Sequence, residues 1–330
     1  MFVVTYKKIF LSLGLIFMAI SATVVAYFGL NLGIDFAGGA LTEVVYQEKP
    51  EASLLEDMLS DPDLDLGGFS LRETVGDGGK PGYILRSRDL SDEERVKVSS
   101  LLVSEGEGGE VTRFTSIGPV IGQELRDKAV WAISAVVLII IIYVAFAFRG
   151  VSYPVGGWVY GGITIIALAH DILIPTALMA VLGFAYGVEV DVLFVMALLA
   201  VLGYSVNDTI VVFDRVRENL QQFRTEKKVK KNVGGVIEEE VTYKLNKPFQ
   251  EIVGLSVSQT ITRSINTSIT TLVALTALYF FGAEVTKTFA LILTAGVLAG
   301  TYSSLFFANP LLIYMAERKA KQEGETLSDK

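Results

Sequence analysis

Six long apolar runs dominate this sequence and constrain its fold more than any other feature. Each has about 20 or more residues with few charges, which is the length that a helix needs to cross the hydrocarbon core of a bilayer. Hydrophobic residues make up 51% of the 330 residues and charged residues only 19%, whereas a soluble domain carries about a quarter charged residues. The runs are Ile9–Leu30, Val130–Phe148, Tyr153–Leu182, Val188–Phe213, Ser264–Phe281 and Thr286–Met315. We therefore predict a polytopic α-helical membrane protein with six transmembrane helices.

The first run also has features of a signal peptide, because Lys7 and Lys8 precede it. A signal peptide has an apolar core of about 7–15 residues, however, and this run is longer. We expect it to stay in the protein as a membrane anchor.

Cysteine is absent and histidine occurs once, as His170. Disulfides, thiolate catalysis and cysteine metal sites are therefore excluded, as is a polyhistidine metal site within this chain. Because the sequence also lacks a catalytic triad, a phosphate-binding loop and a metal-ligand cluster, we expect no enzymatic activity and no cofactor. Nothing in it indicates nucleic acid as a partner.

Basic residues near the ends of membrane spans indicate their orientation. With six spans, all four basic groups fall on one side, so we expect both termini in the cytoplasm. The groups are Lys7 and Lys8, then Arg149, then the basic cluster between spans 4 and 5, and finally Arg318, Lys319 and Lys321.

The segment 31–128 then lies outside the cytoplasm and is long enough to fold by itself. Its pattern predicts elements in the order β-α-β-β-α-β, which is the ferredoxin-like arrangement of an α+β domain. Ser91 and Glu94 have the spacing of a capping box at the start of the second helix. The expected strands are Ala40–Gln47, Phe69–Val75, Tyr83–Arg88 and Val111–Ile117, the expected helices are Pro50–Leu59 and Ser91–Ser104, and the sequence GDGGKPG forms a turn between the middle strands.

The predicted division of the chain follows from these assignments. In the loop between spans 4 and 5, Lys-rich and Glu-rich blocks flank Gly234 and Gly235, which indicates a solvated loop or a short hairpin. Its basic half is also suited to contact with anionic lipid headgroups. The segments are 1–30 (N-terminus and span 1), 31–128 (external domain), 129–213 (spans 2–4), 214–262 (cytoplasmic loop), 263–315 (spans 5 and 6) and 316–330 (cytoplasmic tail).

Asp208 is the candidate for function, because a carboxylate inside an apolar span is costly and usually faces a bundle interior or a water path. Arg263 is the one charge in the apolar stretch 252–282. Antiparallel neighbouring spans place the two at similar depth. If the helices shift, Asp208 loses this partner and takes up a proton, which it releases when the pair forms again. The alternative is a static ion pair that holds two helices together.

Polar residues concentrate around these charges and favour a wetted path. Hydroxyl and amide groups can relay water or an ion, although they also stabilise helix packing. His170 and Asp171 form another polar pair inside an apolar run, either as a second relay or as a hydrogen-bonded packing contact. The polar groups of the first site are Asn207, Tyr204, Asn266, Thr267 and Thr270.

Five motifs resemble those of the SecD/SecF family of protein-export membrane proteins, and three of them resemble its SecF members. They follow in family order, fit six spans and cover nearly the whole chain. The motifs are GIDFAGGALTEV at 33–44, SIGPVIGQEL at 116–125, ALAHD at 167–171, GYSVNDTIVVFDRVREN at 203–219 and TITRSINTS at 260–268.

The resemblance implies a subunit of the bacterial protein-export machinery, similar in its membrane part to the resistance-nodulation-division superfamily. Such proteins sit in the plasma (inner) membrane and act with SecD, and often YajC, beside the SecYEG channel. They are thought to use the proton or sodium motive force to draw preproteins outward. By motif, Asp208 and Arg263 match the ion-transport residues of the family, and Asn207 lies beside them. The loop between spans 4 and 5 departs from the family in length, and the chain contains no SecD half.

Two other functions stay open from the residues alone. One is a small-molecule exporter built from half-size chains, which needs a ligand pocket in the external domain. The other is an assembly factor that transports nothing, in which Asp208 and Arg263 form only a structural ion pair.

Overall fold

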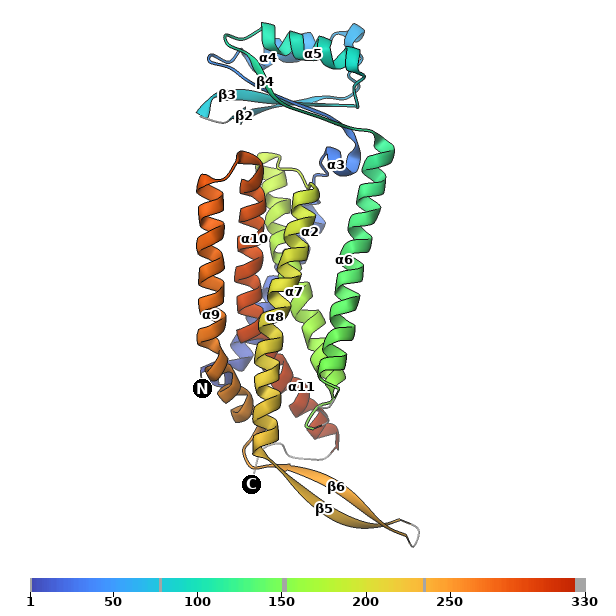
Figure 1. Cartoon of the computed structure of the whole chain (residues 1–330), viewed down its shortest axis with the longest axis vertical. Coiled ribbons are helices and arrows are strands. Elements are labelled where there is room, and N and C mark those ends of the chain that lie inside the picture. The colour runs from blue at the N-terminus through green and yellow to red at the C-terminus, as the bar shows by residue number, and fades with distance from the viewer. Residues whose placement is uncertain (1, 77–78, 150–152, 234–235, 324–330) are drawn as a thin grey trace.

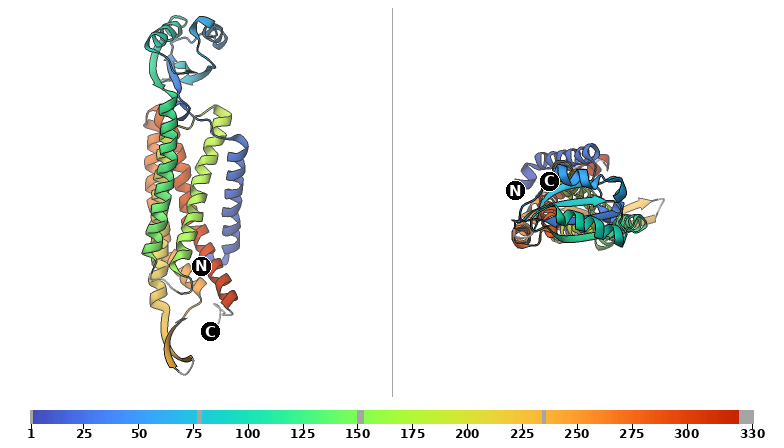
Figure 2. Two further views of the ribbon diagram at one scale, coloured as in Figure 1. Left: turned by 90° about the vertical axis from the view of Figure 1, so that its right-hand side faces the viewer. Right: turned by 90° about the horizontal axis from the view of Figure 1, so that it is seen from above.

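The computed structural model describes residues 2–76, 79–149, 153–233 and 236–323. The molecule is elongated, with a long helix bundle that carries a small α/β domain at one end and a β-hairpin at the other (Figures 1 and 2). Both described ends of the chain lie at the hairpin end of the bundle (Figure 1).

Six helical segments in the described part of the chain are long and apolar enough to span a membrane. This confirms the prediction of a polytopic helical membrane protein. The segments are α2 (Lys7–Phe28), α6 (Pro119–Ala147), α7 (Gly157–Tyr186), α8 (Val192–Phe223), α9 (Phe249–Phe281) and a last span, Glu284–Gln322. A short helix, α1 (Phe2–Thr5), precedes α2.

Several helices extend further than the apolar runs indicated. Helix α6 begins at Pro119 rather than at Val130, and the last span ends at Gln322 rather than at Met315. Two further extensions, of α8 and α9, lie at the hairpin end. α8 continues past Phe213 to Phe223, and α9 begins at Phe249 rather than at Ser264. Both extensions are amphipathic, since Val216 and Leu220 of α8 and Phe249 of α9 are buried in one apolar core. Charged residues on the opposite face hid this helical continuation from a search for apolar runs.

The last span is not a continuous α-helix. It consists of α10 (Glu284–Tyr302), a π-helical segment η3 (Ser303–Phe307) and α11 (Ala308–Glu323). Pro310 follows and lacks a backbone donor. The Asn309 side-chain amide donates instead to the carbonyls of Ser304 (2.7 Å) and Leu305 (3.2 Å).

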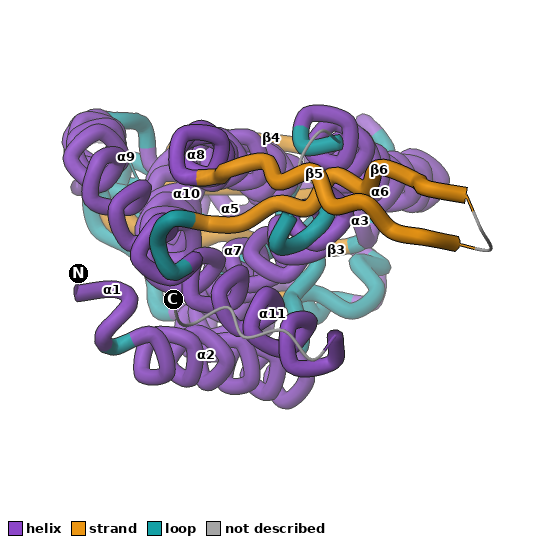
Figure 3. The backbone as a smooth tube through the Cα atoms, turned by 90° about the horizontal axis from the view of Figure 1, so that it is seen from below, coloured by secondary structure: helices purple, strands orange, loops and turns teal. Residues whose placement is uncertain are grey.

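In the bundle, α7 packs against α2 on one side and against α8 and α10 on another (Figure 3). Two glycines let α10 approach α8 closely. A Cβ at Gly296 would collide with Val201, and one at Gly300 would lie 2.9 Å from the Cβ of Ser205. The helices α2 and α6 leave broad apolar faces exposed, as Trp131 (75% exposed) illustrates.

The domain that we predict to be external, which we call the external domain, has the predicted element order, β-α-β-β-α-β. Its four strands form one antiparallel sheet in the order β2-β3-β1-β4. Figure 1 shows both helices on the face of the sheet that points away from the bundle. The elements are β1 (Gly39–Val45), α4 (Ala52–Leu59), β2 (Ser70–Val75), β3 (Pro81–Ser87), α5 (Asp92–Ser104) and β4 (Glu110–Ile117), with a 3-10 turn, η1 (Pro62–Leu64), after α4. In the predicted GDGGKPG turn, residues 77 and 78 lie outside the described part.

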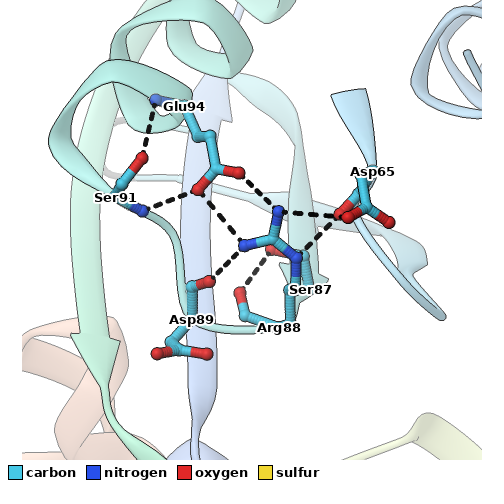
Figure 4. A network of polar contacts seen from close by, with 6 residues as sticks. All are labelled: Asp65, Ser87, Arg88, Asp89, Ser91 and Glu94. Atoms are coloured by element: carbon cyan, nitrogen blue, oxygen red, sulfur yellow. Dashed lines mark hydrogen bonds and ion pairs between the residues drawn. The ribbon is translucent and has the colours of Figure 1, made fainter. Parts of the chain in front are cut away.

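The predicted capping box at the start of α5 is confirmed and is part of a larger network (Figure 4). Ser91 accepts from the Glu94 backbone, and Glu94 accepts from the Ser91 N–H at 2.8 Å. Arg88 donates to Glu94 at 2.5 and 3.2 Å and to the Asp65 carbonyl at 2.7 Å. The hydrogen bond from Arg88, aided by those from Ser91, lowers the pKa of Glu94 to about 2. This network therefore fixes the loop before α5 against η1.

Between α8 and α9 the chain forms an antiparallel hairpin of β5 (Arg224–Val233) and β6 (Val236–Leu245). Of the two predicted alternatives, a solvated loop and a short hairpin, the structure has the hairpin. Gly234 and Gly235, between the two charged blocks, lie outside the described residues. The hairpin projects beyond the end of the bundle (Figure 1).

Candidate functional site

Asp208 lies on the inner face of α8, about midway along the helix. Its side chain is buried, with 4% exposure. The Oδ2 atom has no hydrogen-bond partner among the described residues. A buried, unpartnered carboxylate oxygen is costly, so this position has the character of a functional site rather than of a packing contact.

Helix α9 brings Ser264 next to Asp208. The Ser264 hydroxyl lies near the Asp208 carboxylate and interacts with it. The Oγ atom of Ser264 nevertheless makes no hydrogen bond of regular geometry to a described residue. Ser264 is itself fully buried. The predicted alignment of the two helices is therefore correct, and a hydroxyl faces the acid at this level.

Arg263 takes a different position from the predicted one. Its side chain is exposed on α9. Among the described residues, no ion pair within 4.0 Å joins Arg263 to Asp208. Its positive charge is still close enough to attract the carboxylate. The physical reason is that adjacent residues of a helix point about 100° apart, so that Ser264 faces inward and Arg263 does not. The expected direct ion pair is thus absent in this conformation. A change in their pairing between conformations stays a prediction.

A hollow of about 240 Å³ extends from Arg263 toward the hairpin end, between α8 and α9. Its lining includes the intrahelical ion pair Arg215–Glu218 (2.8 Å) and Asp214, which pairs with Arg217 at 2.5 Å. Its lining residues are Val211, Asp214, Arg215, Glu218, Gln259, Thr260 and Arg263. A recess lined by charged residues therefore begins about a helical turn from the buried acid.

On the other side of the Asp208 level, three hydroxyls connect three helices. Tyr204 of α8 donates to Ser268 of α9 at 3.1 Å, and Ser268 contacts Thr301 of α10 at 2.6 Å. Tyr204 was predicted to be one of the polar groups near Asp208, whereas Thr301 was missed because its partner lies 33 positions away in the sequence. The cluster supplies polar groups along the α8–α9 contact.

The remaining predicted residues divide between two locations. Asn207, Asn266 and Thr270 are exposed on the outer surface of the bundle, and Thr267 is half-buried. His170 and Asp171 are fully buried on α7 and form a separate cluster that contacts α8 and η3. The structure does not bring this second pair into contact with Arg263. The described residues hold no group of three or more His, Asp or Glu side chains arranged for a metal ion.

The external domain is fixed to the loop that leads into α8, a feature that sequence analysis missed. Arg86 of β3 donates to Glu189 at 2.7 Å and to the Leu32 carbonyl at 2.9 Å. Arg72 of β2 donates to the Gly187 carbonyl. We name Arg72, Arg86 and Glu189 the latch. No local pattern signals it, because it joins residues about a hundred positions apart.

The segment after α2 strengthens this connection. The Gly33 N–H donates to the Val190 carbonyl at 2.8 Å, and the Val190 N–H donates to the Asn31 carbonyl at 2.7 Å. Asp35, in the short helix α3 (Ile34–Ala37), accepts from the Val192 N–H at 2.9 Å. The first residues of α8 are therefore bound to the base of the external domain.

Glycines 38 and 39 lead from α3 into β1 with positive φ values of 75° and 121°. A Cβ at Gly39 would lie 2.5 Å from the Ser87 carbonyl oxygen. Both the backbone conformation and the close approach require glycine, which explains the glycine pair in the motif at 33–44.

Comparison with known proteins agrees with these features. The family model described as "Protein export membrane protein SecD/SecF, C-terminal" matches residues 97–318, and the "SecD/SecF GG Motif" model matches residues 28–49. "Protein translocase subunit SecF" of Thermobaculum terrenum is 37% identical over 317 residues, which cover 94% of this chain and 92% of that protein. The protein of the same name from Anaerolinea thermophila is 37% identical and covers 93% and 91%.

A solved structure is also similar. The crystal structure of SecDF, described as a translocon-associated membrane protein, from Thermus thermophilus superposes with a TM-score of 0.75 at 30% identity. The match covers 94% of this chain and 38% of the longer SecDF chain. With the six spans, the motifs and the match over nearly its whole length, the chain belongs to the SecD/SecF family of protein-export membrane proteins, as a multi-pass member of the Sec pathway.

Proposed function

We propose that this protein is the SecF-type subunit of a Sec accessory complex, in which ion movement through the membrane part drives protein export. The coupling ion is a proton or, alternatively, a sodium ion. Asp208 carries the ion, and the preprotein leaves through the SecYEG channel. The protein has no enzymatic activity and needs no cofactor.

One observation carries this proposal: a buried, unpartnered carboxylate on the helix whose first residues are bound to the external domain. A proton that binds Asp208 removes a buried charge and changes how α8 packs against α9. One elementary charge that crosses 100 mV releases about 2.3 kcal/mol, so one or two ions per cycle suffice to move a domain that α8 and the latch hold.

The arrangement around Asp208 supports access from one side at a time. The charged hollow at Arg263 leads toward the hairpin end, and the Tyr204–Ser268–Thr301 cluster lies on the side of the external domain. When the helices shift, the distance between Arg263 and Asp208 changes, and the carboxylate binds or releases its ion accordingly. We assign the hairpin end and both termini to the cytoplasm, because the basic residues gather there.

The external domain is then extracytoplasmic, and its strand order and antiparallel pairing support a ferredoxin-like fold. It is the part that contacts emerging polypeptide. The broad apolar faces of α2 and α6 are suited to lipid or to a neighbouring membrane subunit. Since SecD and SecF are fused in the similar SecDF proteins, a separate SecD is the expected neighbour, with YajC as a further component, in the bacterial inner membrane.

Preprotein export into inverted vesicles with the SecD partner present tests the proposal. We expect Asp208→Asn to assemble normally, to keep the ATP-driven step and to lose most of the gradient-dependent export. The matched control is Asp57→Asn, an exposed acid of α4, which leaves export unchanged. Full gradient-dependent export by Asp208→Asn refutes the role of the carboxylate.

A further inference from the structure

The buried pair His170 and Asp171 has a richer environment than a packing contact requires. Both side chains have 0% exposure. One Asp171 oxygen contacts His170 Nδ1 at 2.8 Å. The other accepts from Ser303 Oγ at 2.7 Å and from Ser205 Oγ. Donors from α7, α8 and η3 thus converge on one carboxylate.

The imidazole of His170 is fixed in place but only half satisfied. Its ring stacks on Tyr302 and Phe307, with centroid distances of 5.7 and 5.4 Å. Its Nε2 atom is buried and has no hydrogen-bond partner among the described residues. A histidine kept only for packing normally has both ring nitrogens hydrogen-bonded, because a buried polar atom without a partner is destabilising.

Charge balance indicates what this nitrogen does. With the Nδ1 proton directed at Asp171, the pair carries one negative charge in the middle of the bundle. One more proton on Nε2 makes the pair neutral overall, which the low dielectric of the membrane interior favours. We propose that His170 and Asp171 form a second proton-binding site, distinct from Asp208, with Nε2 as the atom that binds and releases the proton.

A sodium ion fits this cluster less well. A hard cation prefers several oxygen ligands with free lone pairs. Here two hydroxyls already donate to the carboxylate, and the imidazole contacts its other oxygen. The neighbouring imidazole adds a nitrogen suited to a proton and not to sodium.

The π-helical segment η3 connects this site to the shape of the last span. Ser303 is its first residue, and π-bulges occur frequently at functional sites. If η3 changes to regular α-helix, Ser303 rotates relative to Asp171 and the carboxylate loses a donor. Helix α2 covers the same region, since Gly14 contacts Phe307 closely and the Tyr302 hydroxyl donates to the Phe10 carbonyl at 2.7 Å.

Among the described residues, few other ionisable groups lie near the pair. Tyr302 stacks on the imidazole, and Asp208 lies three residues beyond Ser205, about 4.5 Å further along α8. The charges of α2 and α11, such as the Lys7–Glu317 ion pair, are at the hairpin end of the bundle. Asp208 therefore lies about one helical turn along α8 from the serine that donates to Asp171, so helix α8 connects the two acids. A role of the pair in export depends on the proposed function, whereas proton binding by the pair does not.

Because His170 is the single histidine of the chain, nuclear magnetic resonance can observe it alone. The full chain, purified with a histidine-free tag and labelled with 15N-histidine, is studied in lipid bilayers from about pH 5 to about pH 9. We expect the imidazole to change from one neutral tautomer to the doubly protonated form as the pH falls. Asp171→Asn moves the midpoint of this change at least about one unit lower, because the stabilising negative charge is gone.

Ser303→Ala is the second variant and does not depend on the folding of Asp171→Asn. Loss of a donor to the carboxylate favours the protonated pair, so the midpoint moves to higher pH. The control Ser258→Ala, at an exposed serine of α9, leaves the midpoint unchanged. An imidazole that stays in one neutral tautomer throughout, or that responds identically in Asp171→Asn, overturns the proposal. A histidine signal that responds to sodium concentration and not to pH also overturns the proposal, because the site then binds a metal cation and not a proton.

The same sample separates this inference from the proposed function. Asp208→Asn retains a pH-dependent histidine signal if the two sites are distinct. A silent His170 together with loss of export in Asp208→Asn refutes the second site alone. A responsive His170 together with full export in Asp208→Asn refutes the role of Asp208 alone.

Discussion

The latch between the external domain and the α7–α8 loop yields a quantitative prediction. Arg86→Ala removes two hydrogen bonds, to Glu189 at 2.7 Å and to the Leu32 carbonyl at 2.9 Å. At 4 Å and an effective dielectric constant of about 20, two unit charges attract by about 4 kcal/mol. Desolvation and side-chain ordering offset most of this. The side chains of Arg86 and Glu189 are 26% and 20% exposed. We therefore expect Arg86 to contribute about 1.5 kcal/mol to the stability of the joint, a value between that of an exposed ion pair and that of a buried hydrogen bond to a charged group.

Hydrogen exchange measures this contribution directly. The amides of Gly33 and Val190 are hydrogen-bonded across the joint that the latch closes, so they exchange when the joint opens. A loss of about 1.5 kcal/mol accelerates their exchange about tenfold in Arg86→Ala and in Glu189→Ala, in lipid nanodiscs. The double variant shows less than the sum of the two effects, because both remove the same interaction. Arg126→Ala, at an exposed arginine of α6, is the control. Unchanged exchange in the single variants, or strictly additive effects, refutes the latch.

Three further predictions concern stability and packing. Arg88 lowers the pKa of Glu94 from 4.5 to about 2, so the contribution of Glu94 to stability is fully present above about pH 4.5 and is lost as the pH falls toward 2. The unfolding temperature of Glu94→Gln therefore depends less on pH in this window than that of the parent. An equal pH dependence of the two proteins contradicts the network. Gly296→Leu forces α10 away from Val201 and lowers the free energy of unfolding by about 1–3 kcal/mol, which a lower unfolding temperature reports. An unchanged unfolding temperature contradicts the close contact. Asn309→Ala leaves two carbonyls of η3 without their side-chain donor and costs about 1–3 kcal/mol; full thermal stability shows that these carbonyls find other partners.

Much of the fold could be predicted because local patterns determine it. Apolar length identified all six spans, and the Ser91–Glu94 spacing identified the start of α5. The bounds of α8 and α9 were wrong at the ends where only one helix face is buried. The π-helical segment was missed, although Asn309 and Pro310 inside an apolar run were a usable signal for an irregular helix.

The candidate site was predicted in part. Asp208 stood out because one charged residue in an apolar span has few structural explanations. Which of two adjacent residues of α9 faces it depends on helix rotation, and this favoured Ser264 over Arg263. The hydroxyls of Ser205 and Ser303 at Asp171 and the latch depend on contacts between distant segments, which a single sequence does not reveal.

A measurement of proton flux is the most direct test of ion transport by Asp208. Vesicles that contain this protein with its SecD partner and a translocating preprotein are given a proton gradient, and a pH-sensitive dye reports the flux. We expect a preprotein-dependent flux that Asp208→Asn abolishes and that Asp57→Asn leaves intact. An equal flux in Asp208→Asn and the parent rules out Asp208 as the ion carrier.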